Sequence, residues 1–180
     1  MMRNGFDAQT LAELPVFQGL TLAEVTEVER ISAVANYPPG STIFWENQPG
    51  DALYAVLQGR VEVRMADGHG GSLTLATLGP GAVLGEMALF TNDVRSASAI
   101  ATAESALLRL PTEAFVGLLN QGHRSAYLVV YNLGQVAAHR LREVNQRLMS
   151  ALAGQGEAAA PRRLDELAEL KRKLFTEWKF

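Results

Sequence analysis

The feature that most constrains the fold of this chain is a run of short, glycine-punctuated segments between Ser41 and Leu110. Nine of the chain's 16 glycines fall between positions 40 and 85. Apolar and charged residues alternate over residues 61–65, and Leu73 and Leu75 alternate with small or polar neighbours. A period of two is typical of strands, and turns that recur every ~10 residues favour a β-sandwich or a barrel-like roll.

A tight turn is expected at residues 67–71, which read Asp-Gly-His-Gly-Gly. Glycine adopts positive φ without steric cost, so this run suits a hairpin connection. On the strand before it, we expect Val61, Val63 and Met65 to point into the core.

Helical patterns lie on both sides of this stretch. Residues 6–37 read as helical, with a capping box from Thr21 to Glu24 and a helix stop at Pro38. Helix returns over residues 112–153. The predicted fold class is therefore α+β: a β-roll (a double-stranded β-helix or jelly-roll) over residues 41–110, flanked by an N-terminal helical bundle and a long C-terminal helix.

The long helix, expected over residues 125–153, carries a heptad-like apolar seam. Its members are spaced by 3, 4, 4, 3 and 4 residues: Val130, Leu133, Ala137, Leu141, Val144 and Leu148. Such a seam packs either on its own domain or on a second copy of the chain. Both readings stay open, and we favour a homodimer through residues 125–153. Gly134 within the seam suggests a close backbone approach or a local bend.

We interpret residues 1–153 as one domain, followed by a linker over 154–161 and an amphipathic helix over 162–180. A short isolated helix is marginal in water, so the last segment must dock on something to stay ordered. The candidates are its own domain, the other subunit or a separate, unknown protein partner.

Composition and charge exclude several classes of protein. The chain has 16 Lys and Arg against 19 Asp and Glu, a net charge of −3. This charge argues against a protein whose main function is to cover nucleic acid, since such proteins usually have a basic face. It has no cysteine, which excludes disulfides and thiolate metal sites. The three histidines lie far apart and no catalytic set is apparent, so we expect no enzyme, no catalytic residues and no metal. No stretch approaches ~18 apolar residues, so we expect no membrane span and a cytoplasmic location.

The segment from Gly85 to Ser96 contains the residues best suited to bind a ligand. Gly85 permits a tight turn, and the residues after Glu86 can form one helical turn whose free amides attract an anion. Arg95 offers a guanidinium fork suited to phosphate, and Ser96 adds a hydroxyl. Glu86 suits a neutral diol such as a ribose. Glu86 would accept hydrogen bonds from a sugar, and Arg95, nine residues later, would donate to a phosphate. This combination indicates a nucleotide-binding pocket.

These residues resemble the phosphate-binding cassette of the cyclic nucleotide-binding domain family, usually written Gly-Glu-Leu-Ala-Leu with an arginine after a short loop. Here the cassette reads Gly-Glu-Met-Ala-Leu-Phe, four residues, then Arg-Ser-Ala. Residues 15–25 are similar to the family's N-terminal helical motif, residues 37–63 to its opening hairpins, and residues 138–148 to the long helix of bacterial members. The resemblance covers roughly residues 14–150. The family often has glycine where Asn47 stands, and asparagine tolerates left-handed φ.

The resemblance implies a role for each cassette residue. Gly85 and Glu86 would contact the ribose 2′-hydroxyl, and Arg95 and Ser96 would contact the cyclic phosphate. The backbone amides of the short turn, at Met87 and Ala88, would complete the anion site.

The long helix would add contacts of its own. Arg140 would reach the ligand or brace Glu86, and Asn145 falls where bacterial relatives contact the purine. Val144 falls there too and departs from the pattern, because its side chain neither donates nor accepts hydrogen bonds.

The resemblance thus implies a stand-alone sensor of cAMP, in preference to cGMP, that signals by moving its C-terminal helices. The nucleotide is a ligand, and no cofactor is expected. The alternative is an interaction or scaffold module that keeps the fold without binding nucleotide. Only 32 residues follow Leu148, too few for a DNA-binding domain of three helices and a wing, so no DNA partner is expected.

Overall fold

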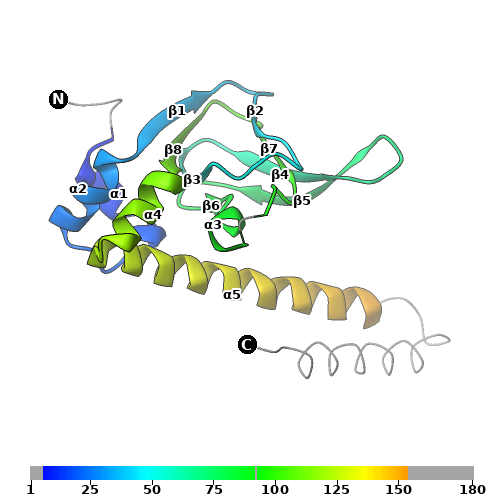
Figure 1. Ribbon diagram of the computed structural model, residues 1–180. Helices are drawn as coiled ribbons and strands as arrows, with labels where there is room; N and C mark the ends of the chain where they lie inside the picture. The colour runs from blue at the N-terminus through cyan, green and yellow to red at the C-terminus, as the bar shows by residue number, and fades with distance from the viewer. Residues whose placement is uncertain (1–5, 92, 154–180) are drawn as a thin grey trace. The chain divides into compact units, whose positions relative to one another are not determined.

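The structure is a computed structural model that describes residues 6–91 and 93–153 (Figure 1). The predicted linker at 154–161 and the predicted helix at 162–180 lie outside the described residues. The chain divides into two compact units, Met1–Gly134 and Gln135–Phe180.

The first unit opens with two short α-helices, α1 (Ala8–Ala12) and α2 (Leu22–Arg30), joined through a 3₁₀ turn at Pro15–Phe17. The predicted capping box is confirmed at the start of α2. The Thr21 amide donates to Glu24 Oε2 at 2.7 Å, and the Glu24 amide donates to Thr21 Oγ1 at 3.4 Å. These bonds satisfy backbone donors that the first helical turn leaves without partners.

The prediction that helix extends over residues 6–37 is wrong at its C-terminal end. The helix α2 stops at Arg30, and residues Ala33–Tyr37 form strand β1. This strand pairs antiparallel with β8 (Ser105–Pro111), so that Tyr37 lies opposite Ser105. The local pattern gave no sign of a partner so distant in sequence, and tertiary pairing overrides local propensity here. The β-roll therefore begins at β1 and not at Ser41.

Within the described residues, eight strands form two four-stranded antiparallel sheets, which confirms the predicted α+β roll (Figure 1). The first sheet has the order β1-β8-β3-β6, with β3 at Ala52–Gln58 and β6 at Val83–Leu84. The second has the order β2-β7-β4-β5, with β2 at Thr42–Phe44, β7 at Ser98–Ala101, β4 at Val61–Ala66 and β5 at Ser72–Leu78.

The predicted hairpin joins β4 and β5. The Asp67 amide donates to Gly71 O at 3.2 Å, and Asp67 Oδ1 accepts from the amides of His69 and Gly71, both at 2.9 Å. Gly68 and Gly70 both have positive φ, as the turn requires.

The expectation that all three apolar residues of β4 are core residues is only partly met. Val61 is fully buried, Val63 is half-buried and Met65 is 39% exposed. A register shift between Val63 and Arg64 interrupts the alternation. Met65 then pairs with Leu73, itself 59% exposed, so the apolar face of the hairpin tip is left uncovered.

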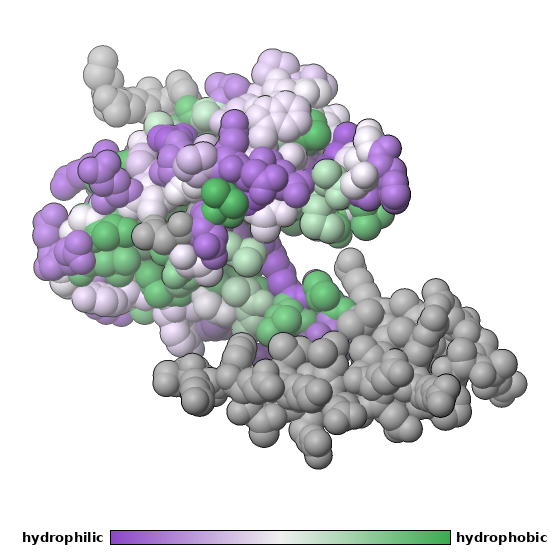
Figure 2. All heavy atoms as spheres, turned by 45° about the vertical axis from the view of Figure 1, so that its right-hand side comes forward, coloured by the Kyte–Doolittle hydropathy of each residue, from purple (hydrophilic) through white to green (hydrophobic). Residues whose placement is uncertain are grey.

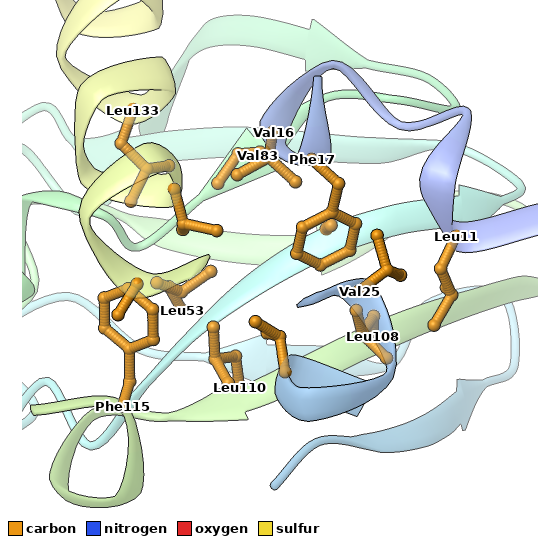
Figure 3. Close-up of a cluster of buried hydrophobic side chains, with 14 residues drawn as sticks. Leu11, Val16, Phe17, Val25, Leu53, Val83, Leu108, Leu110, Phe115 and Leu133 are labelled. Carbon is orange, nitrogen blue, oxygen red and sulfur yellow. The ribbon is translucent and has the colours of Figure 1, made fainter. Parts of the chain in front are cut away.

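The main core lies between the first sheet and the helices (Figure 3). It joins α1, α2, the helix α4 (Thr112–Asn120) and the start of the helix α5 (Arg124–Ala153) to β3 and β8. Its largest fully buried side chains are Phe17, Phe115, Leu11, Leu110 and Leu133. Each such side chain contributes about 1.5–3 kcal/mol on burial, so this cluster fixes the helices against the roll.

The long helix is confirmed, and its seam divides in two. Leu133 is fully buried and Val130 packs against the same cluster, so the first part of the seam belongs to the domain core. In the second unit Leu141 and Val144 are 57% and 59% exposed. Gly134 is the last residue of the first unit, and among the described residues nothing lies within 4 Å of a Cβ built there. The predicted close backbone approach is therefore not found in the described chain.

A polar cluster ties α2 to the start of α5. Glu24 Oε1 accepts from Arg124 at 2.5 Å, and Glu27 Oε2 accepts from the Ser125 hydroxyl at 2.9 Å and lies 3.4 Å from His123 Nδ1. The His123 side chain is half-buried in this cluster.

Exposed large apolar side chains occur on several elements. Figure 2 shows that on the visible face apolar surface is broken up by polar residues. Among the described residues of the first unit, those more than half exposed are Leu22, Trp45, Leu73, Met87, Val94, Tyr127 and Tyr131.

Protonation of Glu24 should destabilise the fold. Hydrogen bonds from the Thr21 amide, then from Arg124 and the Thr21 hydroxyl, lower the pKa of Glu24 from 4.5 to about 2. A carboxyl with a depressed folded-state pKa adds stability that is complete above its unfolded pKa and is lost as the pH falls through the folded value. We expect Glu24→Gln to lower the melting temperature at pH 7 and to flatten its decline between pH 4.5 and 2. Glu13→Gln, at an exposed position, is the control, and an equal decline in wild type and Glu24→Gln would contradict the assignment.

Candidate functional site

The site is built around a glycine turn at the end of β6. Gly85 has φ +77°, and a Cβ there would collide with Arg95 Nη1 and lie 3.3 Å from Ala52 O. Only glycine fits both the backbone conformation and the space. The turn leads into the short helix α3 (Met87–Thr91), and the Leu89 amide donates to Glu86 O at 3.0 Å.

The side chain of Arg95 lies directly beneath this turn, and the residue is only 3% exposed. Its Nη1 donates to Gly85 O at 3.0 Å, and its Nη2 donates to Ala52 O at 2.5 Å. These two bonds link the end of β6 to the start of β3. Arg95 thus stabilises the fold, and it is also the residue predicted to bind the phosphate.

Two aromatic rings contact the same guanidinium. Arg95 Cζ lies 4.3 Å from the centroid of the Phe44 ring and 5.9 Å from that of Tyr54. The faces of aromatic rings attract cations, and this attraction strengthens where water is excluded. Burial lowers the pKa of Arg95, and arginine nevertheless stays protonated in proteins. Within the described chain, Arg95 Nε is buried without a hydrogen-bond partner.

Asp51 joins Arg95 to a second arginine. Its Oδ1 lies 3.4 Å from Arg95 Nη2, and its Oδ2 accepts from Arg109 Nη2 at 2.6 Å. Partial burial raises the pKa of Asp51, but the bond and the charge of Arg109 outweigh that effect, and the pKa is lowered overall. The Asp51 side chain is 64% exposed, so solvent weakens its hold on Arg95. Arg95 therefore lacks a close, buried counter-anion among the described residues.

A cavity of about 380 Å³ adjoins these groups. That volume lies within the range of about 300–1,000 Å³ that is usual for small-molecule sites. Its described lining shares Phe44, Asp51 and Tyr54 with the surroundings of Arg95, and none of Gly85, Glu86 or Ser96 belongs to it. The remaining lining residues are Ile43, Gln48 and Pro49.

The structure brings most of the predicted cassette residues together. Glu86 is buried, at 6% exposure, beside the Gly85 turn. Ser96 is exposed and its hydroxyl donates to Met87 Sδ at 4.0 Å. The backbone of Ala88 lies in α3. These residues and Arg95 lie around one turn, with Glu86 and Arg95 buried and Met87 and Ser96 exposed.

The two predicted residues of the long helix lie in the second unit. Arg140 is half-buried and Asn145 is exposed, both on α5. Their contact with a ligand stays a prediction.

Sequence reasoning assigned no role to Phe44, Asp51, Tyr54 or Arg109. Asp51 and Tyr54 lie within the segment that resembles the family's opening hairpins. The resemblance predicted the hairpins that carry them, but not their contacts with Arg95. The contact of Arg95 with Phe44 joins residues far apart in sequence, and no local pattern signals it.

Asn47 adopts φ +66°, as expected for a residue that replaces a glycine. Its amide donates to Arg95 O at 2.8 Å, and the Arg95 amide donates to Gln48 O at 2.8 Å. This left-handed turn therefore holds the backbone of Arg95 in place.

No group of three or more His, Cys, Asp or Glu residues in the described part of the chain could hold a metal ion. Among the same residues no helix is both long and apolar enough to cross a membrane.

The fold and the site define a ligand-binding β-roll domain with a buried cation under a glycine turn. Residues 34–122 match the model of the cyclic nucleotide-binding domain. The chain belongs to the cyclic nucleotide-binding domain family. It is a regulatory, ligand-binding class of domain.

Three relatives illustrate this membership. The chain is 39% identical over 134 residues to the cyclic AMP receptor protein of Thermus thermophilus, covering 74% of this chain and 60% of that protein. The crystal structure of the catabolite activator protein of Thermus thermophilus superposes with a TM-score of 0.67 at 37% identity, over 76% of this chain and 62% of that one. A cyclic nucleotide-binding domain from Methylobacillus flagellatus gives a TM-score of 0.71 at 26% identity, over 84% of both chains. The chain thus spans about 60% of the first relative's length.

A methyl group at the turn should disrupt the site. We expect Gly85→Ala to destabilise the fold by at least about 1 kcal/mol, because alanine is strained at positive φ and its Cβ displaces the Arg95 guanidinium. Gly79→Ala is the matched control, because nothing lies within 4 Å of a Cβ there. Urea unfolding of both variants measures the difference, and equal stabilities would show that Arg95 does not occupy this space.

Proposed function

We propose that the chain is a cyclic nucleotide sensor that binds cAMP in preference to cGMP and signals through its C-terminal helices. One observation carries the proposal: the Arg95 guanidinium is buried, its Nε has no hydrogen-bond partner in the described chain, and the exposed Asp51 carboxylate lies 3.4 Å from its Nη2. A buried charge is costly unless it is paired. A phosphate would supply the missing anion.

The phosphate site would combine several donors. The guanidinium fork of Arg95 matches two phosphate oxygens, which a point charge cannot do. The Ser96 hydroxyl and the amides of Met87 and Ala88 would add neutral donors. Asp51, exposed and shared with Arg109, would yield its contact with Arg95 to the phosphate at little cost.

The ribose would bind to Glu86. A buried carboxylate beside a phosphate repels it, unless its oxygens face neutral hydroxyl groups. A ribose 2′-hydroxyl is such a group, and Glu86 is buried between the Gly85 turn and α3, whose first amides would bind the phosphate. The sugar and phosphate of one 3′,5′-cyclic nucleotide thus suit one short segment.

The base would be recognised by the long helix, with Arg140 and Asn145 as contacts. The preference for cAMP is supported by the Arg-Ser-Ala sequence of the cassette and by the relative named as a cyclic AMP receptor protein. Val144 offers no hydrogen bond to the base, so selectivity would rest mainly on Asn145.

The signal would pass through α5. Its first part is fixed in the domain core through Val130 and Leu133, whereas Ala137, Leu141 and Val144 are exposed in the single chain. An apolar seam of this kind suits a second copy of the chain, so we propose a homodimer through residues 125–153. Ligand binding would shift the balance between arrangements of these helices. A cytoplasmic location and a protein partner for residues 162–180 also remain proposals.

Removing the guanidinium should abolish tight binding. We expect Arg95→Ala to weaken cAMP binding by roughly 10- to 100-fold, because a hydrogen bond to a charged group is worth about 1.5–3 kcal/mol. Arg95→Lys should also lose affinity, because lysine lacks the fork. Isothermal titration calorimetry measures both.

Two controls make this test specific. Arg60→Ala removes an exposed arginine of the same charge and should leave the affinity unchanged. Thermal melts must show that the Arg95 variants are folded, because Arg95 also holds the Gly85 and Ala52 carbonyls. Wild-type affinity in folded Arg95→Ala would place the pocket elsewhere, and no binding by wild type would favour the scaffold alternative.

Charges on the exposed seam should produce monomers. We expect the double variant Leu141→Glu and Val144→Glu to be monomeric in light scattering at concentrations where the wild type is a dimer, because both side chains would become buried at the interface. Gln146→Glu is the control, because it lies five residues after Leu141 and thus on the far side of the helix. A monomeric wild type at tens of micromolar would contradict the dimer.

A further inference from the structure

Met87 is an exposed residue that lies directly after the Gly85 turn of the candidate site. Met87 is 56% exposed, whereas the other methionines whose exposure the structure describes, Met65 and Met149, are 39% and 51% exposed. Its Sδ accepts the hydrogen bond of the Ser96 hydroxyl at 4.0 Å. The sulfur of a largely exposed residue therefore contacts a hydroxyl that is proposed to bind the phosphate.

We propose that Met87 is a reversible oxidation site through which peroxide lowers the affinity for the cyclic nucleotide. This inference rests on the proposed function, because it concerns the same pocket. The proposed effect on affinity involves only Met87 and the Ser96 hydroxyl, which donates to the Met87 sulfur.

The reaction is a two-electron oxygen transfer. A lone pair of Met87 Sδ attacks one oxygen of hydrogen peroxide, an S–O bond forms, the O–O bond breaks and water leaves. The sulfur is oxidised to the sulfoxide and the peroxide is reduced to water. Exposure governs which methionine reacts, and Met87 at 56% is open to peroxide, as is Met149 at 51%.

The sulfoxide would change the contact with Ser96 in a defined way. A thioether is a weak acceptor, so the Ser96 hydroxyl leaves Met87 readily for a phosphate oxygen. A sulfoxide oxygen is polar and a far stronger acceptor, so it would compete for that hydroxyl. Its partial negative charge would also lie at the anion site and repel the phosphate. Both effects would lower the affinity for the cyclic nucleotide.

The other two methionines are internal controls. Met65 lies on β4 opposite Leu73, and Met149 lies on α5 in the second unit. The methionine sulfur that accepts from the Ser96 hydroxyl is that of Met87. Oxidation at these positions should therefore leave the cassette chemistry intact.

The experiment treats the full chain with hydrogen peroxide and follows each sulfoxide by peptide mass spectrometry. Calorimetry with cAMP before and after treatment is expected to show about a tenfold loss of affinity when Met87 is fully oxidised, the value of one hydrogen bond to a charged group. Methionine sulfoxide reductases A and B should restore the affinity. Met87→Gln, which places a polar carbonyl near the same position, should show a loss without oxidant.

The decisive comparison uses Met87→Leu, measured against its own untreated baseline. Its affinities before and after peroxide should be equal, whereas the double variant Met65→Leu and Met149→Leu should keep the full response. An unchanged affinity in wild type with complete Met87 sulfoxide, or an equal loss in Met87→Leu, would overturn the inference. Absence of cAMP binding before any treatment would instead overturn the proposed function on which it rests.

Discussion

The burial of one guanidinium group organises the site and joins the parts of the roll that surround it. Arg95 donates to the carbonyls of Gly85 and Ala52, rests on the Phe44 ring and lies near Asp51. Each contact joins a different element, so the cation holds the turn, two strands and a loop together. A buried charge with an unpartnered Nε is also the group that a phosphate would satisfy. Structure and proposed function thus depend on the same side chain.

The fold supplies what this arginine requires. Glycine at position 85 leaves space for the guanidinium, and the left-handed turn at Asn47 fixes the backbone of Arg95. The helical core, in which Phe115 and Leu133 are fully buried, attaches the first part of α5 to the same sheet that carries β6. We propose that a change at the cassette reaches the first part of α5 through these packed side chains.

Much of this architecture was predictable from sequence because its signals are local. The capping box at Thr21, the hairpin at residues 67–71 and the long helix all follow from short patterns. The features that were missed depend on distant partners. Strand β1 exists because it pairs with β8, and a register shift in β4 exposes Met65. The cassette was recognisable as a motif, but the aromatic support of its arginine required three-dimensional contacts.

The most direct test of the central claim is calorimetric titration of the wild-type chain with cAMP and with cGMP. If a phosphate pairs with the buried Arg95, the titration should show saturable binding of one cAMP molecule per chain with micromolar or tighter affinity. The melting temperature should also rise with ligand concentration. Weaker binding of cGMP would agree with the proposed preference. No heat and no thermal shift with any 3′,5′-cyclic nucleotide at millimolar concentration would contradict the claim and leave the domain as an interaction module that retains the fold.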